Sequence, residues 1–589
     1  MKKIFSLTQI VLIVGCIMVY SSCSEDFLKK EPPAVLSLSS METERGVEGM
    51  LIGTYACLRS GWDVFGSSMG TDWVYASIAS DDCYKGSDPG DAINCALVER
   101  FEVLPSNAYM EMRWKACYNG VARSNETLVV LKVVQAGSSP LSAERATQIE
   151  AESKYLRAWF HFSANRIFKN IPYVRTPDEQ GGKQPDEIPN PDPGWSGIEA
   201  DLNFAIEHLP ESWPSSDVGR PTKFAAMTLK AQAYMYQNKL SEAKPLLDGV
   251  LNSGKYELVE NYFDNYNEDT ENNEESIFEI QCATETSAHT SMLVTRPSAH
   301  QVGPFNLGWG FYQPTNDLVN CYQVDNNGLP YLDVNTRPQI KSDMGVTAVT
   351  PFTPTDQVVD LRLDWTVSRR GIPFLDWGVA PGASWIRQQA NGGPYMTKKY
   401  HHFRKNHDSQ FPQGRFNHRN FRYHRLAHVI LWRAEIAVEE NELSLARELV
   451  NRIRNRAKIS DPVMGFVSAD VIPVSGVVDP SQVDWTKPAA NYKVEPYPEG
   501  HVAFSSQSNA RDAVRMEIRL EFATEGQRFF DLRRWGIDIV TLNDYIRRDL
   551  DFRSYLTGVT YSEKNRYWPI PQSQIDLQMG VLIQDPAYM

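Results

Sequence analysis

Apolar side chains recur every three to four residues through several long stretches of the chain, a spacing that predicts amphipathic helices. The first such helix is predicted from Thr43 to about Leu58. Its apolar face carries Val47, Met50, Leu51 and Tyr55. Longer stretches with the same spacing predict helices over 112–134 and 141–168. The second of these ends before Pro172, which cannot continue a helix.

Two further stretches predict helical hairpins. The first begins after Pro221 and turns at Asn238, and its second helix is predicted to start with Ser241 as N-cap and to end near Gly254. Alanines alternate with bulky residues over about 34 positions, as in tetratricopeptide (TPR) pairs. The same pattern returns over 426–437 and 445–456. Two pairs so far apart predict a helical framework whose units are separated by long insertions.

The largest insertion, residues 259–420, is rich in Asn, Gly, Pro and aromatic residues and has little sustained periodicity. Short alternating pieces within it, such as SIFEIQC at 276–282, predict strands. Long ordered loops commonly carry function, so we expect functional residues here.

The N-terminus has the layout of a secretory signal. Two lysines precede an apolar run from Ile10 to Tyr20, and small residues then lead to Cys23. A membrane-spanning helix needs about 20 apolar residues, and this run is shorter. Small residues before a cysteine look like a bacterial lipobox, which predicts acylation of Cys23. The alternative is ordinary signal cleavage, with Cys23 an incidental thiol.

The rest of the chain is acidic and rich in aromatic residues. The formal net charge is −14, which argues against general nucleic-acid binding because that needs a basic surface. Aromatic residues make up 11% of the chain, and exposed rings are the usual platform for the apolar faces of sugars. Six cysteines remain after Cys16 and Cys23 are set aside. None of them forms a C-x-x-C motif, so we expect buried free thiols.

Motifs for catalysis or metal binding are weak. Six of the eleven histidines lie between 401 and 428, and His424 and His428 have i,i+4 spacing on a predicted helix. Arg425 stands where a metalloprotease motif needs Glu, and nearby Lys and Arg residues repel a cation. We interpret this basic segment as a solvated loop, with an anion-facing patch as the alternative. No metal ion or cofactor is expected.

Nucleophile elbows and Gly-rich phosphate loops are absent from the sequence. Carboxylates that could serve a glycoside hydrolase are Asp81, Asp82, Asp364 and Asp376, but spacing in the sequence cannot pair them. The segment EGQRFFDLRRWG at 525–536 is either a binding ridge or a structural element. We favour the structural interpretation, with Phe529, Phe530 and Leu532 buried and the charged residues paired around them.

Several segments in this order behind a lipobox resemble the SusD/RagB family of outer-membrane nutrient-binding lipoproteins. The resemblance runs from Cys23 to the C-terminus. The segments that carry it are CSEDFLKKEPP (23–33), ASDDCYKGSD (79–88), YLRAWFHFSANRIFKNIPYV (155–174), GRPTKFAAMTLKAQAYMY (219–236), GWGFYQPTNDLVNCY (308–322), DLRLDWTVSRRGIPFLDWG (360–378), GGPYMTKKY (392–400), EGQRFFDLRRWG (525–536) and WPIPQSQI (568–575).

The resemblance implies a mainly α fold, in which four TPR-like helix pairs form an α-α superhelix that cradles an irregular, loop-rich subdomain with short strands. The regions expected on this basis are a signal peptide (1–22), a lipidated flexible tether (23–42), an N-terminal helical region (43–258), the insertion (259–420) and a C-terminal helical region (421–589). The acids that follow Cys23 resemble the signal that sends such lipoproteins to the outer leaflet.

The resemblance further implies a protein without catalysis. It would be anchored to the outer membrane through Cys23, would face the cell exterior, and would deliver glycans to a SusC-like, TonB-dependent transporter. The family's glycan site is built from loops. We therefore expect Trp62, Phe65, Tyr84 and Trp309 as stacking rings, with Asp63 and Lys85 as hydrogen-bond partners. Trp377 and Trp385 are further candidates, and for every tryptophan the alternative is burial in the core.

Two other functions remain open from the sequence. The same fold serves a binder of peptides or of another nutrient, because fold does not fix ligand. A lipid-anchored glycoside hydrolase is the third possibility.

Overall fold

The computed structural model describes residues 41–59, 69–282, 309–354, 356–406, 419–468, 471 and 477–589. Its helices are α3 (Glu44–Ala56), α4 (Ile93–Glu99), α5 (Ala108–Ala136), α6 (Ala143–Phe168), α7 (Trp195–His208), α8 (Lys223–Tyr236), α9 (Leu240–Leu251), α11 (Asn316–Cys321), α12 (Arg362–Thr366), α13 (Gln389–Gly392), α15 (Leu426–Glu439), α16 (Leu443–Ile459), α17 (Gln507–Phe522), α18 (Arg528–Arg534), α19 (Asp538–Asp549) and α20 (Gln572–Leu577). Its strands are β1 (Cys83–Gly86), β2 (Ser276–Ile280), β3 (Phe311–Pro314), β4 (Val367–Ser368), β5 (Met396–Thr397), β6 (Phe421–Arg425), β7 (Met464–Val467) and β8 (Val483–Pro488).

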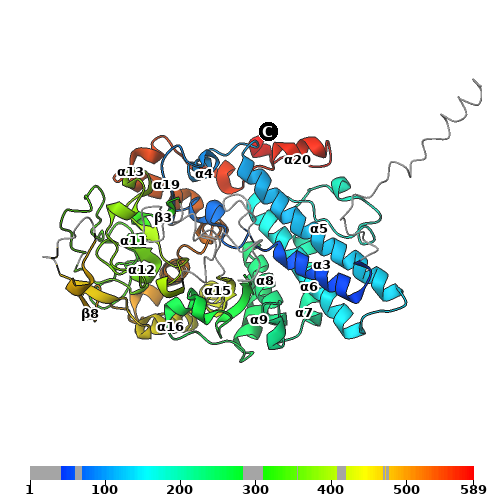
Figure 1. Ribbon diagram of the computed structural model, residues 1–589, viewed down its shortest axis with the longest axis horizontal. Helices are drawn as coiled ribbons and strands as arrows, with labels where there is room; N and C mark the ends of the chain where they lie inside the picture. Colours follow the sequence, from blue (N-terminus) through cyan, green and yellow to red (C-terminus); the bar gives the residue numbers. More distant parts are fainter. Residues whose placement is uncertain are drawn as a thin grey trace, which may run out of the picture.

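The N-terminal helices lie on the right of Figure 1, where α5 to α9 pack each against the next and α3 packs on α5 and α6. Their starts are set by side-chain caps: Thr43 accepts a hydrogen bond from the backbone amide of Gly46, Ser142 from Arg145 and Thr222 from Ala225. Helix α6 is the centre of this layer, and every residue from Tyr155 to Phe168 is buried. The mainly α fold expected from the sequence is confirmed.

The two hairpins predicted from the sequence are α8–α9 and α15–α16, and they pack against each other through α9 and α15. Arg433 of α15 pairs with Asp248 of α9 at 2.8 Å, and Lys244 pairs with Glu440 at 2.6 Å. These contacts join the two hairpins in space, although the insertion separates them in sequence.

The strands of the described residues pair two by two, always antiparallel: β1 with β3, β2 with β6, β4 with β5 and β7 with β8. Strand β2 confirms the prediction for 276–282. Three of these ladders join residues of the insertion to one another or to flanking regions, and β1–β3 ties residues near position 84 to residues near 313. The irregular region is thus fastened to the helices at several points.

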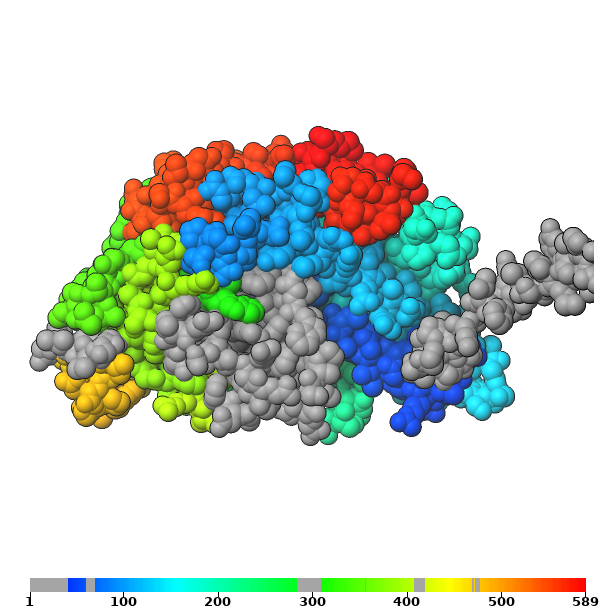
Figure 2. All heavy atoms as spheres, turned by 45° about the horizontal axis from the view of Figure 1, so that its top comes forward, coloured from blue at the N-terminus to red at the C-terminus, as the bar shows by residue number. Residues whose placement is uncertain are grey.

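Segments from both ends of the sequence lie together along one edge of the molecule. Figure 2 shows residues near 100 in blue beside the C-terminal part in orange and red. Hydrogen bonds join them. The side-chain amide of Asn565 donates to the carbonyl oxygen of Phe101 at 2.8 Å, and the backbone amide of Gln572 donates to the carbonyl oxygen of Pro105 at 2.9 Å. The C-terminal region thus completes the N-terminal helical layer.

Two local predictions are wrong. Helix α9 begins at Leu240 and not after Ser241. The hydroxyl of Ser241 donates to Glu242 at 2.6 Å and does not cap the helix. The chain turns at Asn238, whose φ is +56°, so the helix starts directly after this turn. His424 and His428 do not share a helix, because His424 lies in strand β6 and His428 lies in the first turn of α15.

The six cysteines among the described residues form no disulfide with one another, as predicted: Cys83, Cys95, Cys117 and Cys321 are buried, and Cys57 and Cys282 are half-buried. Within the same residues, none of the helices has the length and apolar character needed to cross a membrane.

Candidate ligand-binding site

Gly70, Cys282 and Asn420 come together in space, and in sequence they adjoin the segments 60–68, 283–308 and 407–418. Ile280 pairs with Phe421 across β2–β6, and the backbone amide of Cys282 donates to the side-chain oxygen of Asn420 at 2.7 Å. A Cβ added to Gly70 would come within 3.0 Å of Ile280 and 3.1 Å of Phe421. Flanks of three segments far apart in sequence therefore meet at the end of one ladder.

The ladder beneath this meeting point is fixed by buried charges. Arg425, at the end of β6, has a fully buried side chain and pairs with Glu275 at 2.8 Å, Glu521 at 2.6 Å and Glu525 at 3.0 Å. Arg456 of α16 bridges Glu275 and Glu521, and Lys399 pairs with Glu525 at 2.9 Å. Strands β2 and β6, helices α16 and α17 and the 399 segment are thereby held by one network.

This network corrects the interpretation of the basic segment as a solvated loop. Of its basic residues, Lys398, Lys399, Arg419, Arg422 and Arg425 are buried. Partners far away in sequence decide this, because Glu275, Glu521 and Glu525 supply the carboxylates that make burial of the cations tolerable. Burial opposes ionisation of Glu525, but the charges of Arg425 and Lys399 prevail and hold its pKa at about 2.

His424 and His428 are structural. His424 bonds to the side-chain oxygen of Gln232 at 2.9 Å, and the ring of His428 stacks on Phe522 with centroids 4.0 Å apart. Burial lowers the pKa of His428 to about 3, so its ring is neutral. No group of three or more potential metal ligands occurs among the described residues.

A second, polar cluster joins residues 281–282 to Asn420, and we call these residues the two stems because they adjoin the segments 283–308 and 407–418 in sequence. Asn420 also donates to the side-chain oxygen of Gln281 at 2.9 Å, and its backbone amide donates to the carboxylate of Glu271 at 2.6 Å. Burial raises the pKa of Glu271 to about 7, and the neighbouring charge of Glu279 adds to the rise. The state of this carboxyl group therefore changes near neutral pH, directly beside the stems of two segments.

Of the residues predicted to contact ligand, Trp62, Asp63 and Phe65 lie outside the described residues, as does Cys23. Tyr84 does not present its ring to a ligand, and that prediction is wrong. Its side chain is fully buried, its hydroxyl donates to Asp549 at 2.5 Å, and the guanidinium of Arg553 lies 3.5 Å from the ring centroid. Tyr84 instead joins strand β1 to helix α19.

Lys85 is also wrongly predicted as a ligand contact. Its side chain is buried, and its ammonium group donates to the carbonyl oxygens of Asp88 and Asp91, both at 2.7 Å. Burial lowers the pKa of Lys85. These bonds close the loop after β1, so the residue shapes the backbone there.

The remaining aromatic candidates are half-buried. Trp309 stands at the end of the 283–308 segment and packs against the main hydrophobic core. Trp377 and Trp385 flank a small cluster around Phe374, and the indole N–H of Trp377 donates to the carbonyl oxygen of His402 at 2.9 Å. Part of each ring remains exposed, so all three stay candidates.

Of the four carboxylates named as possible catalytic groups, three form ion pairs and the fourth accepts backbone hydrogen bonds. Asp81 binds Arg528 at 2.8 Å and Asp82 binds Arg519 at 2.9 Å, while Asp364 forms a two-point pair with Arg369 at 2.7 Å. The carboxylate of Asp376 accepts the backbone amide of Lys405 at 3.0 Å. The structural interpretation of 525–536 is correct, since Phe529, Phe530 and Leu532 are fully buried and Arg534 pairs with Asp531.

Comparison with known proteins places these features in a family. The family described as "SusD family" matches residues 274–588, which is more than half of the chain. A second family, described as "Starch-binding associating with outer membrane", matches residues 26–235. SusD-like protein P25 of Formosa agariphila is 22% identical over 604 residues and covers 98% of each chain.

Solved structures share the fold. Surface glycan-binding protein A from Bacteroides thetaiotaomicron superposes with a TM-score of 0.65 at 21% identity, over 93% of this chain and 99% of that one. A structure of the same protein in complex with laminarihexaose gives a TM-score of 0.63. A SusD-like protein from Bacteroides fragilis gives 0.66 at 20% identity, over 95% of this chain and all of its own.

Proposed function

This chain belongs to the SusD family, and from that premise we propose that it binds a glycan at the cell surface and delivers it to a TonB-dependent outer-membrane transporter. In this proposal Cys23 carries lipid and anchors the body to the outer membrane, facing outward. The chain acts by binding, without turnover of the glycan.

The observation that carries the proposal is the meeting of three segment flanks at the end of the β2–β6 ladder. Two of the segments concerned, 60–68 and 283–308, hold or adjoin the predicted stacking rings Trp62, Phe65 and Trp309. A scaffold commonly presents functional residues on loops fixed to a rigid base, and the buried charge network under this ladder supplies such a base. Aromatic rings on such segments suit the apolar faces of sugar rings.

The nature of the relatives agrees with a carbohydrate ligand. The second matching family is described as starch-binding, and one solved relative is described as binding laminarin. Both statements belong to those proteins. For this chain they select the first ligands to test, namely laminarin and starch, followed by other plant, host and microbial polysaccharides and a peptide mixture.

Isothermal titration against this panel tests the proposal. Wild type should bind at least one polysaccharide, and replacing Trp62 and Phe65 together by Ala should weaken binding by about 1–3 kcal/mol per ring, the scale found for stacking of bases on aromatic rings. If the chain binds only peptides in this panel, its ligand is a peptide and not a glycan. Steady release of reducing sugar would show an enzyme instead.

Delivery to a transporter is tested separately. Mild detergent extraction of cells grown on the bound glycan, followed by affinity purification of this chain, should recover a large TonB-dependent barrel. Repeated recovery of the chain alone under those conditions would favour a free-standing surface binder.

A further inference from the structure

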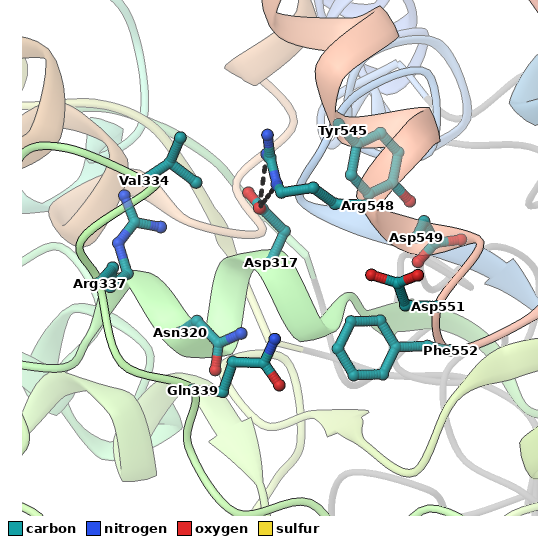
Figure 3. Close-up of a pocket in the computed structure, with 10 residues that line it drawn as sticks. All are labelled: Asp317, Asn320, Val334, Arg337, Gln339, Tyr545, Arg548, Asp549, Asp551 and Phe552. Atoms are coloured by element: carbon teal, nitrogen blue, oxygen red, sulfur yellow. Dashed lines mark hydrogen bonds and ion pairs between the residues drawn. The ribbon is translucent and has the colours of Figure 1, made fainter.

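A polar pocket lies between helix α11 and the turn that follows α19, and the site described above makes no use of it. Figure 3 shows its side chains facing a common space: Asn320 and Gln339 from one wall, Asp551 and Phe552 from the other. Its cavity volume is about 100 Å³, which is below the roughly 300–1,000 Å³ of ordinary small-molecule sites. None of the residues at the β2–β6 ladder lines it.

The aromatic ring in this pocket is not used by the core. Phe552 is half-buried, yet it belongs to none of the hydrophobic clusters of the described residues and pairs with no other described aromatic ring. In Figure 3 the ring stands at one side of the pocket, opposite Arg337. A flat apolar face that the fold leaves unpacked is suited to a ligand that has an apolar face of its own.

Polar groups around the ring have unused hydrogen-bonding capacity. The side chain of Arg337 donates to the sulfur of Cys321 at 3.0 Å, but its Nε is buried without a partner in the described structure. Asn320 accepts the backbone amide of Ile340 at 2.8 Å, which leaves its NH₂ group for a ligand. The carboxylate of Asp551 has no hydrogen-bond or ion-pair partner among the described residues.

The floor of the pocket is fixed and charged. Asp317 pairs with Arg548 at 2.7 Å and with Arg519 at 3.0 Å, and these charges lower the pKa of Asp317 despite its burial. Asp317 therefore stays ionised, and both arginines pair with it. Its side chain forms a fixed boundary between this pocket and the cavity next to it. The free groups are those on the rim.

The pocket continues into a longer groove along α17 and α19. A neighbouring cavity of about 210 Å³ shares Asp317, Val334, Arg337 and Arg548 with it, so the two adjoin. Arg515 and Asp512 line the far part, where Arg515 lies over the ring of Trp535 without an ion-pair partner among the described residues. The two cavities together present a groove and not an enclosed pocket, which suits a chain molecule lying along it.

Charges on the rim balance. Among the described residues, two cations in this groove form no ion pair, Arg337 and Arg515, and neither do two anions, Asp512 and Asp551. A polyanion would gain from the arginines and lose against the carboxylates. A neutral sugar suits this mixture, because each of its hydroxyls both donates and accepts hydrogen bonds and its ring has an apolar C–H face.

We propose that this groove is a second carbohydrate subsite that takes a neutral oligosaccharide, with one sugar ring on Phe552 and its hydroxyls bonded by Asp551, Arg337 and Asn320. The inference rests on the proposed glycan-binding function and adds a site separate from the loops. Two separate contacts on one glycan chain would raise its overall affinity by holding the second contact at high effective concentration.

The experiment is isothermal titration of the full-length chain with laminarihexaose, cellohexaose, mannohexaose and hexagalacturonate. Three variants are compared. The groove variant combines Phe552→Ala with Asp551→Asn, the loop variant combines Trp62→Ala with Phe65→Ala, and Phe466→Ala is the control. Phe466 is 42% exposed on β7 and lies outside the groove, so it matches the loss of an exposed ring.

Wild type should show two sites for a neutral hexasaccharide. The groove variant should lose one site, or weaken it at least tenfold, while the loop variant keeps that site and the Phe466→Ala protein matches wild type. A groove variant that binds like the control, with the loop variant losing all binding, overturns the groove and leaves the glycan-binding function intact. Tighter, Arg337-dependent binding of hexagalacturonate overturns the neutral class. No binding to any sugar by wild type overturns both proposals.

Discussion

The backbone amide of Cys282 donates a hydrogen bond of 2.7 Å to the side chain of Asn420, although the two residues are 138 positions apart in the chain. This bond joins the stems of two segments, 283–308 and 407–418, at the end of the β2–β6 ladder. It makes the positions of Cys282 and Asn420 depend on each other, and we therefore expect Asn420 to act as a positioning residue in the proposed glycan site.

Replacing Asn420 by Ala should destabilise the protein and weaken glycan binding. The change removes the acceptor of the Cys282 amide and the donor to Gln281, and an unsatisfied buried group costs about 1–3 kcal/mol. Urea denaturation and titration with the bound glycan measure the two effects. Asn335→Ala is the control, because Asn335 is exposed and bonds only to the nearby Asp333. Equal stability of the two variants would contradict a role for Asn420 in joining the stems.

Replacing Glu521 by Gln should be far more costly than any surface change. Glu521 is fully buried and pairs with Arg425, Arg456 and Arg362, so neutralising it leaves three buried cations short of one charge. Removing one partner from a buried pair costs about 3–5 kcal/mol.

The matched control for Glu521 is Arg511→Ala, which breaks the exposed pair between Arg511 and Glu439 at 2.6 Å. An exposed pair contributes at most about 1 kcal/mol. Guanidinium denaturation at pH 7 gives both free energies of unfolding. A loss for Glu521→Gln no larger than that for Arg511→Ala would show that the network does not hold the ladder.

Glu271 should make the protein less stable as pH rises from about 4.5 to 7. Burial raises its pKa to about 7 in the folded protein, against an ordinary value of 4.5, so the folded state binds the proton more tightly. Folding then gains stability from this group below pH 4.5 and loses it progressively up to pH 7. The Glu271→Gln variant keeps an acceptor for the amide of Asn420 and should lack this decline.

Free energies of unfolding at half-unit steps from pH 4.5 to 8 check the Glu271 prediction. The difference between variant and wild type should grow to about 1–3 kcal/mol at pH 7. A constant difference across the range would mean that Glu271 does not titrate there.

Replacing Tyr84 by Ala should destabilise the region around α19 without changing the affinity for glycan. The buried ring packs under Arg553 and its hydroxyl bonds to Asp549, so truncation should cost about 3–5 kcal/mol. Glycan affinity measured at a temperature where the variant is folded should equal that of wild type. A selective loss of affinity with unchanged stability would restore Tyr84 as a ligand contact.

Replacing Cys23 by Ala should release the protein from the membrane. The predicted acyl chains on Cys23 are the anchor, and each buried CH₂ contributes about 0.8 kcal/mol to membrane binding. Fractionation of cells should find the variant in the soluble or unprocessed fraction, and intact mass should show lipid on wild type alone. An unmodified thiol at Cys23 in native protein would exclude the anchor.

The sequence by itself determined the helices and the class of fold. Periodic apolar residues place α3, α5, α6, α8 and the α15–α16 hairpin because an amphipathic helix records its buried face locally. Ordered motifs likewise identified the family, and 525–536 was correctly predicted as structural because alternating aromatic and charged residues on a short helix have few other arrangements.

The tertiary structure alone decided which polar residues are inside. Arg425 is buried because Glu275, Glu521 and Glu525 reach it from three distant parts of the chain, and no local pattern encodes that meeting. Tyr84 looked like a loop aromatic until Asp549 and Arg553 enclosed it. The groove beside Phe552 and the joined stems at Asn420 are likewise products of long-range packing, since each brings together side chains whose positions depend on the whole fold.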